Sequence, residues 1–145
     1  DGTIDRARLG PLVFSDPDAR RFLDGLIHPL VLAEQEKAVR RLEREGRVRI
    51  FVSEAALTVE SGYAGLFDRV VVVHCDGAEQ VRRLSLRDGV DGRTARRKIA
   101  AQMPQEEKLK HADYALDTTG TLAETVERTE RLYAQLIRDW ENKQG

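Results

Sequence analysis

Two short apolar runs, residues 50–52 and 70–73, constrain the fold of this chain more than any other feature of its sequence. Neither run alternates polar with apolar residues, so we expect both to be strands that are buried on both faces, as in a parallel α/β sheet. The connector between them exceeds the roughly two to five residues of a hairpin turn, and it is long enough for a crossover. The two runs therefore predict a parallel sheet with helical connections.

Composition excludes several classes of protein. The 145 residues are 41% hydrophobic, which predicts one globular domain with a buried core. The 24 basic and 25 acidic residues nearly cancel, so the overall charge favours no polyanionic partner such as nucleic acid. The single cysteine, Cys75, cannot form an internal disulfide or a cysteine-based zinc site, and we expect a cytoplasmic protein without a metal site built from its own side chains. No apolar run reaches the roughly 18–20 residues of a membrane span, and no charged-then-apolar leader opens the chain, so no membrane association is expected.

Start and stop signals place the other elements. Residues 4–14 predict a short helix that Gly10 and Pro11 interrupt, and Ser15 is the expected N-cap of the next helix. His28-Pro29 should end that helix and open another, which Gly46 closes. Thr121 and Glu124 form a capping box for a terminal helix. The remaining expected elements are strands at 48–52, 69–75 and 113–117, a loop-to-helix segment around 54–60, and helices at 78–88, 93–102 and 104–111.

A basic surface is expected between residues 82 and 98, because this stretch contains seven lysine and arginine residues and only two aspartates. Positive charge around glycine punctuation suggests a mobile anion clamp, because planar guanidinium groups hold phosphate oxygens in pairs. A solvated helix face balanced by acids elsewhere explains the charge equally well. Nucleic acid fits less well, since no aromatic side chains lie among the basic residues to stack on bases.

Three further side chains are candidates for chemistry. His28 could act as a general base, although a histidine before a helix-opening proline is more often a structural hydrogen-bonding group. Glu54 follows the first expected strand, where open α/β sheets bind ligands, so it could organise Mg²⁺ or substrate, or it could be a solvated carboxylate. Glu60 could simply terminate the following helix with Gly62.

The order of three segments resembles the dephospho-CoA kinase family, P-loop kinases that perform the last step of coenzyme A synthesis. The segments are DGTIDRARLGPLVFSDPDARRFLDGLIHPLV, ESGYAGLFDRVVVVHC and EQVRRLSLRDGVDGRTARRKIAAQMPQEEKLKHADYALDTTG. The resemblance covers essentially the whole chain, which is similar to the C-terminal two-thirds of these proteins. It implies a three-layer P-loop kinase-type parallel sheet, incomplete here, with a helical substrate-binding part and a helical lid.

The resemblance also implies a reaction and a division of labour. The family transfers the γ-phosphoryl group of ATP to the ribose 3′-hydroxyl of dephospho-CoA. Residues 1–46 would bind dephospho-CoA, 47–86 and 112–145 would form the α/β core, and 87–111 would be the lid. In the lid, Arg87, Arg96 and Lys98 would approach the ATP phosphates. The other implied contacts are with substrate, from His28, Pro29, Glu54 and Glu60, and with adenine, from Thr118, Thr119 and Gly120.

Two stretches depart from the family pattern. The family usually has Asp-x-Pro-Leu-Leu after the first strand, and here Glu54-Ala55-Ala56-Leu57-Thr58 stands in its place. This keeps a carboxylate but changes the wall that would face the substrate. The usual asparagine of the adenine loop is Thr118. These substitutions leave open a non-catalytic remnant or regulatory binding module, and a kinase of similar fold acting on another nucleotide-like acceptor.

The largest departure is that no G-x-x-x-x-G-K-S/T loop occurs in the 145 residues. That loop supplies the amides and lysine that hold the ATP phosphates and the hydroxyl that binds Mg²⁺. The family's candidate for activating the ribose hydroxyl, an acid after its second strand, is absent as well. The 145 residues alone are therefore expected to be inactive. Because the P-loop strand is central in the family, the first strand should be one vacant strand position, about 9–10 Å, from the other two.

Overall fold

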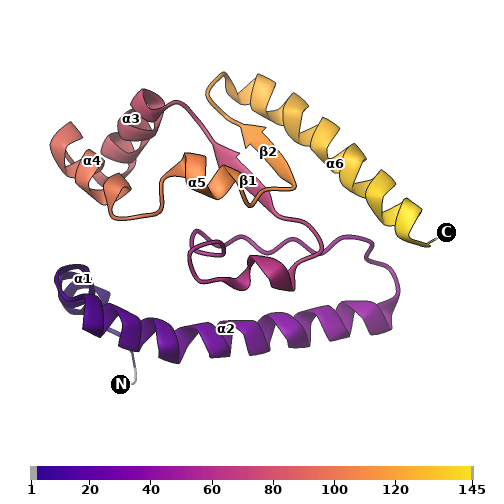
Figure 1. Cartoon of the computed structure of the whole chain (residues 1–145), viewed down its shortest axis with the longest axis horizontal. Helices are drawn as coiled ribbons and strands as arrows, with labels where there is room; N and C mark the ends of the chain where they lie inside the picture. The colour runs from indigo at the N-terminus through magenta and orange to yellow at the C-terminus, as the bar shows by residue number, and fades with distance from the viewer. Residues whose placement is uncertain (1–2, 145) are drawn as a thin grey trace. The chain divides into compact units, whose positions relative to one another are not determined.

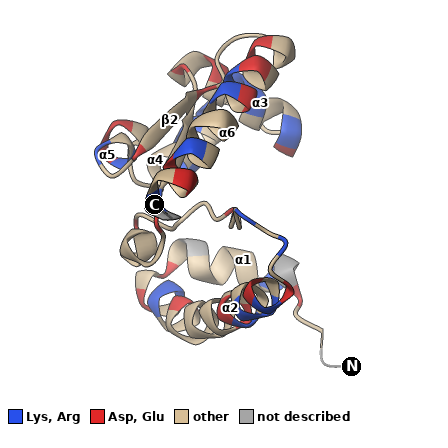
Figure 2. Cartoon of the chain, turned by 90° about the vertical axis from the view of Figure 1, so that its right-hand side faces the viewer, with Lys and Arg blue, Asp and Glu red and all other residues tan. Residues whose placement is uncertain are grey.

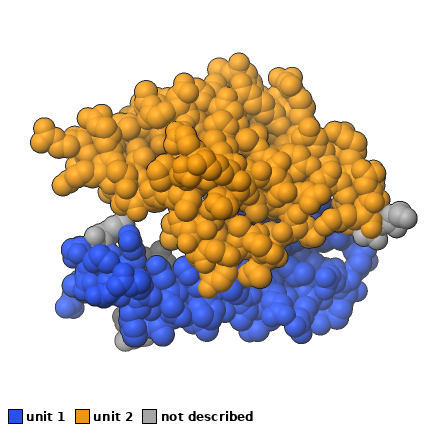
Figure 3. Space-filling view, in the orientation of Figure 1, with its two compact units in different colours: residues 1–53 blue, residues 54–145 orange. Residues whose placement is uncertain are grey.

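The chain forms two compact units, Asp1–Ser53 and Glu54–Gly145, which Figure 3 shows in different colours. The computed structural model describes residues 3–144, without the side chains of residues 6, 7, 14 and 144. Helices α1, α2 and a following segment without helix or strand make up the first unit, and the second holds the sheet and the remaining helices (Figure 1).

The first unit is a short helix, α1 (Arg6–Ser15), packed on a long one, α2 (Pro17–Glu45). Asp16, rather than the expected Ser15, is the N-cap of α2, and its carboxylate accepts hydrogen bonds from the amides of Asp18 (2.8 Å) and Ala19 (3.2 Å). The Ser15 hydroxyl instead donates to the carbonyl of Pro11 (2.8 Å), because α1 continues through that proline. Gly46 closes α2 with φ 64°, as predicted.

The expected break at His28-Pro29 is wrong, because α2 runs through it without interruption. A proline inside a helix removes one amide donor, which leaves the carbonyl four residues earlier without its usual partner. That carbonyl belongs to Gly25, and both Gly25 and Pro29 are exposed, so water can solvate it. The preference against helix before proline is a bias, and the flanking turns outweigh it here.

The first apolar run does not form the predicted strand. Residues 47–55 have no helix or strand, and Phe51 and Val52 are 39% and 77% exposed, so the expected burial is also wrong. A strand needs a neighbour to take its backbone hydrogen bonds, and this run pairs with no described segment. The run lies in the first unit and the sheet in the second, so the strand spacing expected from the sequence stays a prediction.

Two parallel strands form the sheet of the second unit, as the sequence predicts for the expected strands at 69–75 and 113–117. Strand β1 (Val71–His74) pairs with β2 (Tyr114–Asp117), and Val71 is opposite Tyr114 while His74 is opposite Asp117. Only one face of β1 is well covered. Val72 is 7% exposed, whereas Val73 is 60% exposed, so the expected burial on both faces is wrong for this strand too.

Helices surround the sheet close to where the sequence predicts them. Helix α3 packs on α4, α5 lies against β1, and α6 packs on β2 (Figure 1). Turns replace the helix expected around residues 54–60, and a short 3-10 helix follows at residues 63–66. The Thr121–Glu124 capping box is confirmed, since the Thr121 amide donates to Glu124 Oε2 (2.7 Å) and the Glu124 amide to Thr121 Oγ1 (3.2 Å). The bounds are η1 (Tyr63–Leu66), α3 (Gly77–Asp88), α4 (Gly92–Ala100), α5 (Gln105–Leu109) and α6 (Leu122–Gln144).

Over residues 3–144, no helix combines the length and apolar character that crossing a membrane requires.

Candidate active site

The carboxyl ends of β1 and β2 meet at one edge of the sheet, where parallel α/β sheets bind ligands. The two loops that leave this edge are tied to each other by hydrogen bonds. The Thr118 amide and hydroxyl donate to the carbonyl of His74 (2.8 and 3.0 Å), and the Asp76 amide donates to Thr119 Oγ1 (3.0 Å). The predicted adenine loop, Thr118 to Gly120, therefore lies at this edge beside the end of β1.

Arg83 of α3 binds the loop at residues 118–120, the predicted adenine loop. Its guanidinium donates to Thr118 Oγ1 (3.0 Å) and to the Thr118 carbonyl (2.5 Å), and its Nε donates to Glu79 (2.6 Å). Arg82 also binds Glu79, and hydrogen bonds from Arg82 and then Arg83 lower the pKa of Glu79 to about 2. From the sequence, Arg83 is only one of seven basic residues on a charged surface. Its spacing from Glu79, one helical turn, was the available signal of an ordered side chain.

Two other polar side chains bind this edge of the sheet, and neither is among the site residues expected from the sequence. Gln105 of α5 donates to the carbonyl of Cys75 (2.8 Å). Asp117, at the end of β2, accepts from the hydroxyl and amide of Thr119 (2.6 and 2.9 Å) and from Arg128 of α6 (3.0 Å). Those bonds, the Thr119 hydroxyl first, hold the pKa of Asp117 below its ordinary value. The edge is thus pre-ordered by α3, α5 and α6.

The predicted lid cations Arg87 and Lys98 converge on one carboxylate. Arg87 Nε lies 2.9 Å from Asp88 Oδ1, and Lys98 Nζ lies 2.7 Å from Asp88 Oδ2. Hydrogen bonds from Arg87 and then Lys98 lower the pKa of Asp88 to about 2. Asp88 ends α3 and Lys98 belongs to α4, so this carboxylate joins the two helices of the predicted lid. Figure 2 shows the positive and negative residues of α3 and α4 by colour.

Arg96 stands apart from that pair. Its guanidinium lies over Gly92 at the start of α4, within 3.7 Å of the position that a Cβ of Gly92 would take. Arg96 is exposed and makes no ion pair with any residue between 3 and 144. The structure therefore places the three cationic residues that are predicted to be catalytic on α3 and α4, and it brings two of them together.

Glu60 and Glu54, both predicted to contact substrate, have different surroundings. Glu60 Oε1 lies 2.7 Å from Lys108 Nζ of α5, and the two side chains are 19% and 17% exposed. Lys108 also donates to the carbonyl of Ala56 (3.1 Å), so it anchors the turns at 56–60. Glu54 is exposed at the start of this segment. No local sequence pattern connects Lys108 with Glu60, so only the tertiary structure identifies it.

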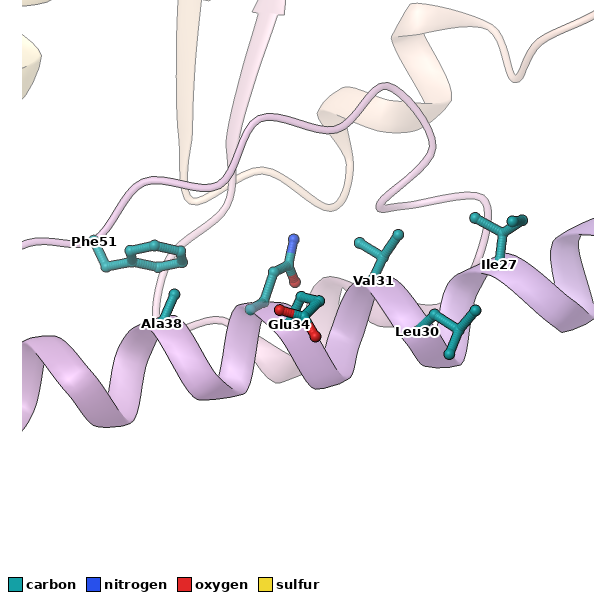
Figure 4. Close-up of a pocket in the computed structure, with 7 residues that line it drawn as sticks. Ile27, Leu30, Val31, Glu34, Ala38 and Phe51 are labelled. Carbon is teal, nitrogen blue, oxygen red and sulfur yellow. The ribbon is translucent and has the colours of Figure 1, made fainter. Parts of the chain in front are cut away.

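The predicted substrate residues His28 and Pro29 belong to the first unit, in the middle of α2. His28 Nε2 lies 3.9 Å from Asp24 Oδ1, and Pro29 is exposed. Beside them the structure has an open apolar cavity of about 470 Å³ (Figure 4). The ring of Phe51 lies over the turn of α2 that carries Ala38. The cavity is lined by Ile27, Leu30, Val31, Glu34, Gln35, Ala38 and Phe51.

No group of three or more His, Cys, Asp or Glu side chains in the described part of the chain is arranged to hold a metal ion. The site combines arginine and lysine donors, hydroxyl groups and backbone amides with the carboxylates that pair with those cations. Such donors bind anionic oxygen, and phosphate above all.

Comparisons with known proteins agree with this chemistry. A family model described as dephospho-CoA kinase matches residues 1–124. A dephospho-CoA kinase of Leifsonia xyli subsp. xyli is 42% identical over 136 residues, which cover 94% of this chain and 69% of the relative. The chain belongs to the dephospho-CoA kinase family.

Solved structures place this dephospho-CoA kinase family member in the same fold. A crystal structure of TT1252 from Thermus thermophilus matches with a TM-score of 0.65 and 33% identity, over 93% of this chain and 69% of that one. Dephospho-CoA kinase from Campylobacter jejuni matches with a TM-score of 0.57 and 25% identity, over 94% of this chain and 67% of that one. The predicted family and the P-loop kinase-type α/β fold are confirmed, and the chain spans about two thirds of these proteins' length.

Proposed function

We propose that this chain supplies the substrate-binding helices, the lid and part of the sheet of an enzyme that phosphorylates the ribose 3′-hydroxyl of dephospho-CoA with ATP. The family match over residues 1–124 carries the proposal. The meeting of Arg87 and Lys98 on one carboxylate supports it, because two cations that share one anion are spaced to share a phosphate. We place the enzyme in coenzyme A biosynthesis and keep the expectation of a cytoplasmic protein.

Each part keeps the role predicted for it. Residues 1–46 bind dephospho-CoA with His28 and Pro29, residues 87–111 form the lid, and residues 47–86 with 112–145 form the core. The lid bases Arg87, Arg96 and Lys98 bind the ATP phosphates and stabilise the negative charge of the transferring group. The order of the Thr118–Gly120 loop, tied to β1 and Arg83, suits a surface against which adenine lies. Glu54 and Glu60 line the acceptor side.

The donor set of the lid fits ATP. Arginine and lysine side chains supply N–H groups for phosphate oxygens, and they remain positively charged at neutral pH. ATP supplies the phosphoryl group, and we expect Mg²⁺ to accompany it. In the lid, Arg87, Arg96 and Lys98 orient the ATP phosphates and exclude water from them.

Turnover of the protein expressed from its natural gene tests the proposal. With ATP and dephospho-CoA, we expect ADP and a new 3′-phosphomonoester signal in ³¹P NMR spectra. Arg87→Ala should lower kcat about a hundredfold or more while the far-UV circular dichroism stays unchanged, because a charge that stabilises the transition state is lost. Arg138→Ala, an exposed arginine on α6, is the matched control and should match the parent.

Two outcomes would contradict the proposal. Absence of the 3′-phosphomonoester would favour the non-catalytic binding module, and phosphorylation of other nucleotide-like acceptors alone would favour a kinase with a different substrate. Equal turnover of the parent and the Arg87→Ala protein would show that the lid assignment is wrong.

A further inference from the structure

Asp88 occupies the space between the two lid cations assigned to the ATP phosphates. Arg87 and Lys98 bind different oxygens of its carboxylate, at 2.9 and 2.7 Å. The Asp88 side chain is 21% exposed, whereas those of Arg87 and Lys98 are 76% and 44% exposed. The anion is therefore the best-covered member of the cluster, and the cations reach it from the solvent side.

A carboxylate held in this way resembles a bound phosphate. Guanidinium and ammonium groups bind carboxylate and phosphate oxygens with the same hydrogen-bond geometry. A phosphate that takes its place between Arg87 and Lys98 would lie against the Asp88 carboxylate, and two anions at such a distance repel each other strongly. Arg87 and Lys98 can form ion pairs with the Asp88 carboxylate or with a phosphate, but not fully with both at once.

The arginines of α4 do not share in this ion pairing. Arg93, Arg96 and Arg97 of α4 are exposed, and none of them forms an ion pair with a residue in the range 3–144. The other lid aspartate, Asp91, is used differently: its carboxylate accepts from the Thr94 amide (2.7 Å) as the N-cap of α4. Asp88 alone neutralises cations that the phosphates need.

We propose that Asp88 is a built-in competitor for the phosphate site of the lid. Without ligand it holds Arg87 and Lys98 together and ties the end of α3 to α4. When substrate binds, a phosphate group displaces the carboxylate and takes over both cations. This inference rests on the proposed function, since it concerns the same lid, and it adds a residue that limits phosphate affinity.

Removal of the Asp88 charge should therefore tighten phosphate binding. Asp88→Asn keeps the size of the side chain but no longer competes as an anion, so we expect inorganic tripolyphosphate to bind about three- to tenfold more tightly. A residue with a purely structural role would give the opposite result, because loss of the brace would let Arg87 and Lys98 separate.

The experiment uses the protein expressed from its natural gene and inorganic tripolyphosphate as the probe. Titrations followed by the Arg87 Nε–Hε signal in NMR spectra give the dissociation constant of the parent, Asp88→Asn and Asp91→Asn proteins. Asp91→Asn is the matched control, because it removes the same charge three residues away and asparagine still caps a helix. We expect the Asp88→Asn protein to bind more tightly and the control to stay within about twofold of the parent.

Three results would overturn the inference: weaker or equal binding by Asp88→Asn, equal tightening by Asp91→Asn, or no response of Arg87 in any protein. Asp88→Ser, which also lacks the charge, provides a second measurement if the asparagine variant does not fold. The proposed function is judged separately by turnover. If the natural protein forms the 3′-phosphomonoester and Arg87→Ala slows that reaction, an Asp88→Asn protein that does not bind more tightly refutes only the inference that Asp88 competes with phosphate.

Discussion

Lys108 and Glu60 form the most enclosed ion pair of the described residues, at 2.7 Å and with both side chains less than one-fifth exposed. Neither Glu60 oxygen accepts a well-directed hydrogen bond from the described residues, so the Lys108 charge is its main compensation. A residue on α5 thus stabilises a carboxylate in the turns at 56–60 and binds the Ala56 carbonyl as well. At the scale of single residues, Lys108 connects α5 to these turns through both contacts.

Lys108→Ala should lower the free energy of unfolding by about 1–3 kcal/mol, because it leaves a covered carboxylate without its cation. Lys110→Ala, on the exposed Lys110–Glu107 pair, is the control and should stay within about 0.5 kcal/mol of the parent. Urea unfolding followed by circular dichroism measures both. The double replacement Glu60→Gln with Lys108→Met should recover most of the loss; equal destabilisation by the single and double variants would contradict this explanation.

At the scale of elements, the capping box determines where α6 begins. Thr121→Ala removes the hydroxyl that accepts from the Glu124 amide, so we expect stability to fall by about 1 kcal/mol. Thr129→Ala removes a hydroxyl bonded to the Thr125 carbonyl in the middle of the same helix, and it should change stability by less than about 0.5 kcal/mol. Thermal unfolding of the two variants would disagree with this account if Thr129→Ala cost as much as Thr121→Ala.

Docking of α6 on the sheet should depend on pH through Asp139. Its carboxylate accepts from the Tyr114 hydroxyl (2.6 Å) and from Arg69 (2.9 Å), which hold its pKa below the ordinary value. A carboxyl with a lowered folded-state pKa adds stability that is complete above about pH 4 and is lost as pH falls through the folded value.

Asp139→Asn should therefore destabilise the chain most near pH 7, and the difference from the parent should shrink as the pH falls below about 4. Unfolding by urea at several pH values from 7 to about 2.5 measures this difference. Asp76→Asn replaces an exposed carboxylate that forms no ion pair with a described residue, and it should follow the parent throughout. A difference for Asp139→Asn that does not vary with pH would show that its charge has no part in the docking.

At the scale of the whole molecule, the chain exposes much apolar surface. Its accessible area is 11175 Å², whereas two separately folded units of these lengths would together expose only about 9,000 Å². Val72 and Ala95 are the only buried apolar residues in the described part of the chain. Phe22, Leu26 and Leu30 on α2 are 70%, 52% and 64% exposed, and contiguous apolar surface of this kind favours association.

We expect the 145-residue chain to self-associate at micromolar concentration and to bind the dye ANS. Leu26→Gln with Leu30→Gln should weaken both effects without loss of helix content, since glutamine has a good helix propensity. Lys37→Gln with Arg40→Gln, at exposed charged positions of α2, should not weaken them. Sedimentation velocity and dye fluorescence test this, and equal association of the two double variants would rule out the apolar surface of α2 as the cause.

The sequence by itself determined the features that depend on neighbours a few residues away. The left-handed Gly46 cap, the Thr121–Glu124 box, both paired strands and α3, α4 and α5 agree with the sequence analysis, because each is set by local propensity or by contacts within about one helical turn. The family resemblance likewise follows from residue order, and the lid that it implies for residues 87–111 stays a prediction.

The tertiary structure alone decided what depends on distant partners. Arg83 meets Thr118 across 35 residues, and Arg69 meets Asp139 across 70, so no local pattern pairs them. The run at 50–52 has the composition of a strand, yet it stays unpaired because backbone hydrogen bonds require a neighbour that composition cannot supply. The same holds for Asp88, whose position between Arg87 and Lys98 depends on how α3 and α4 pack.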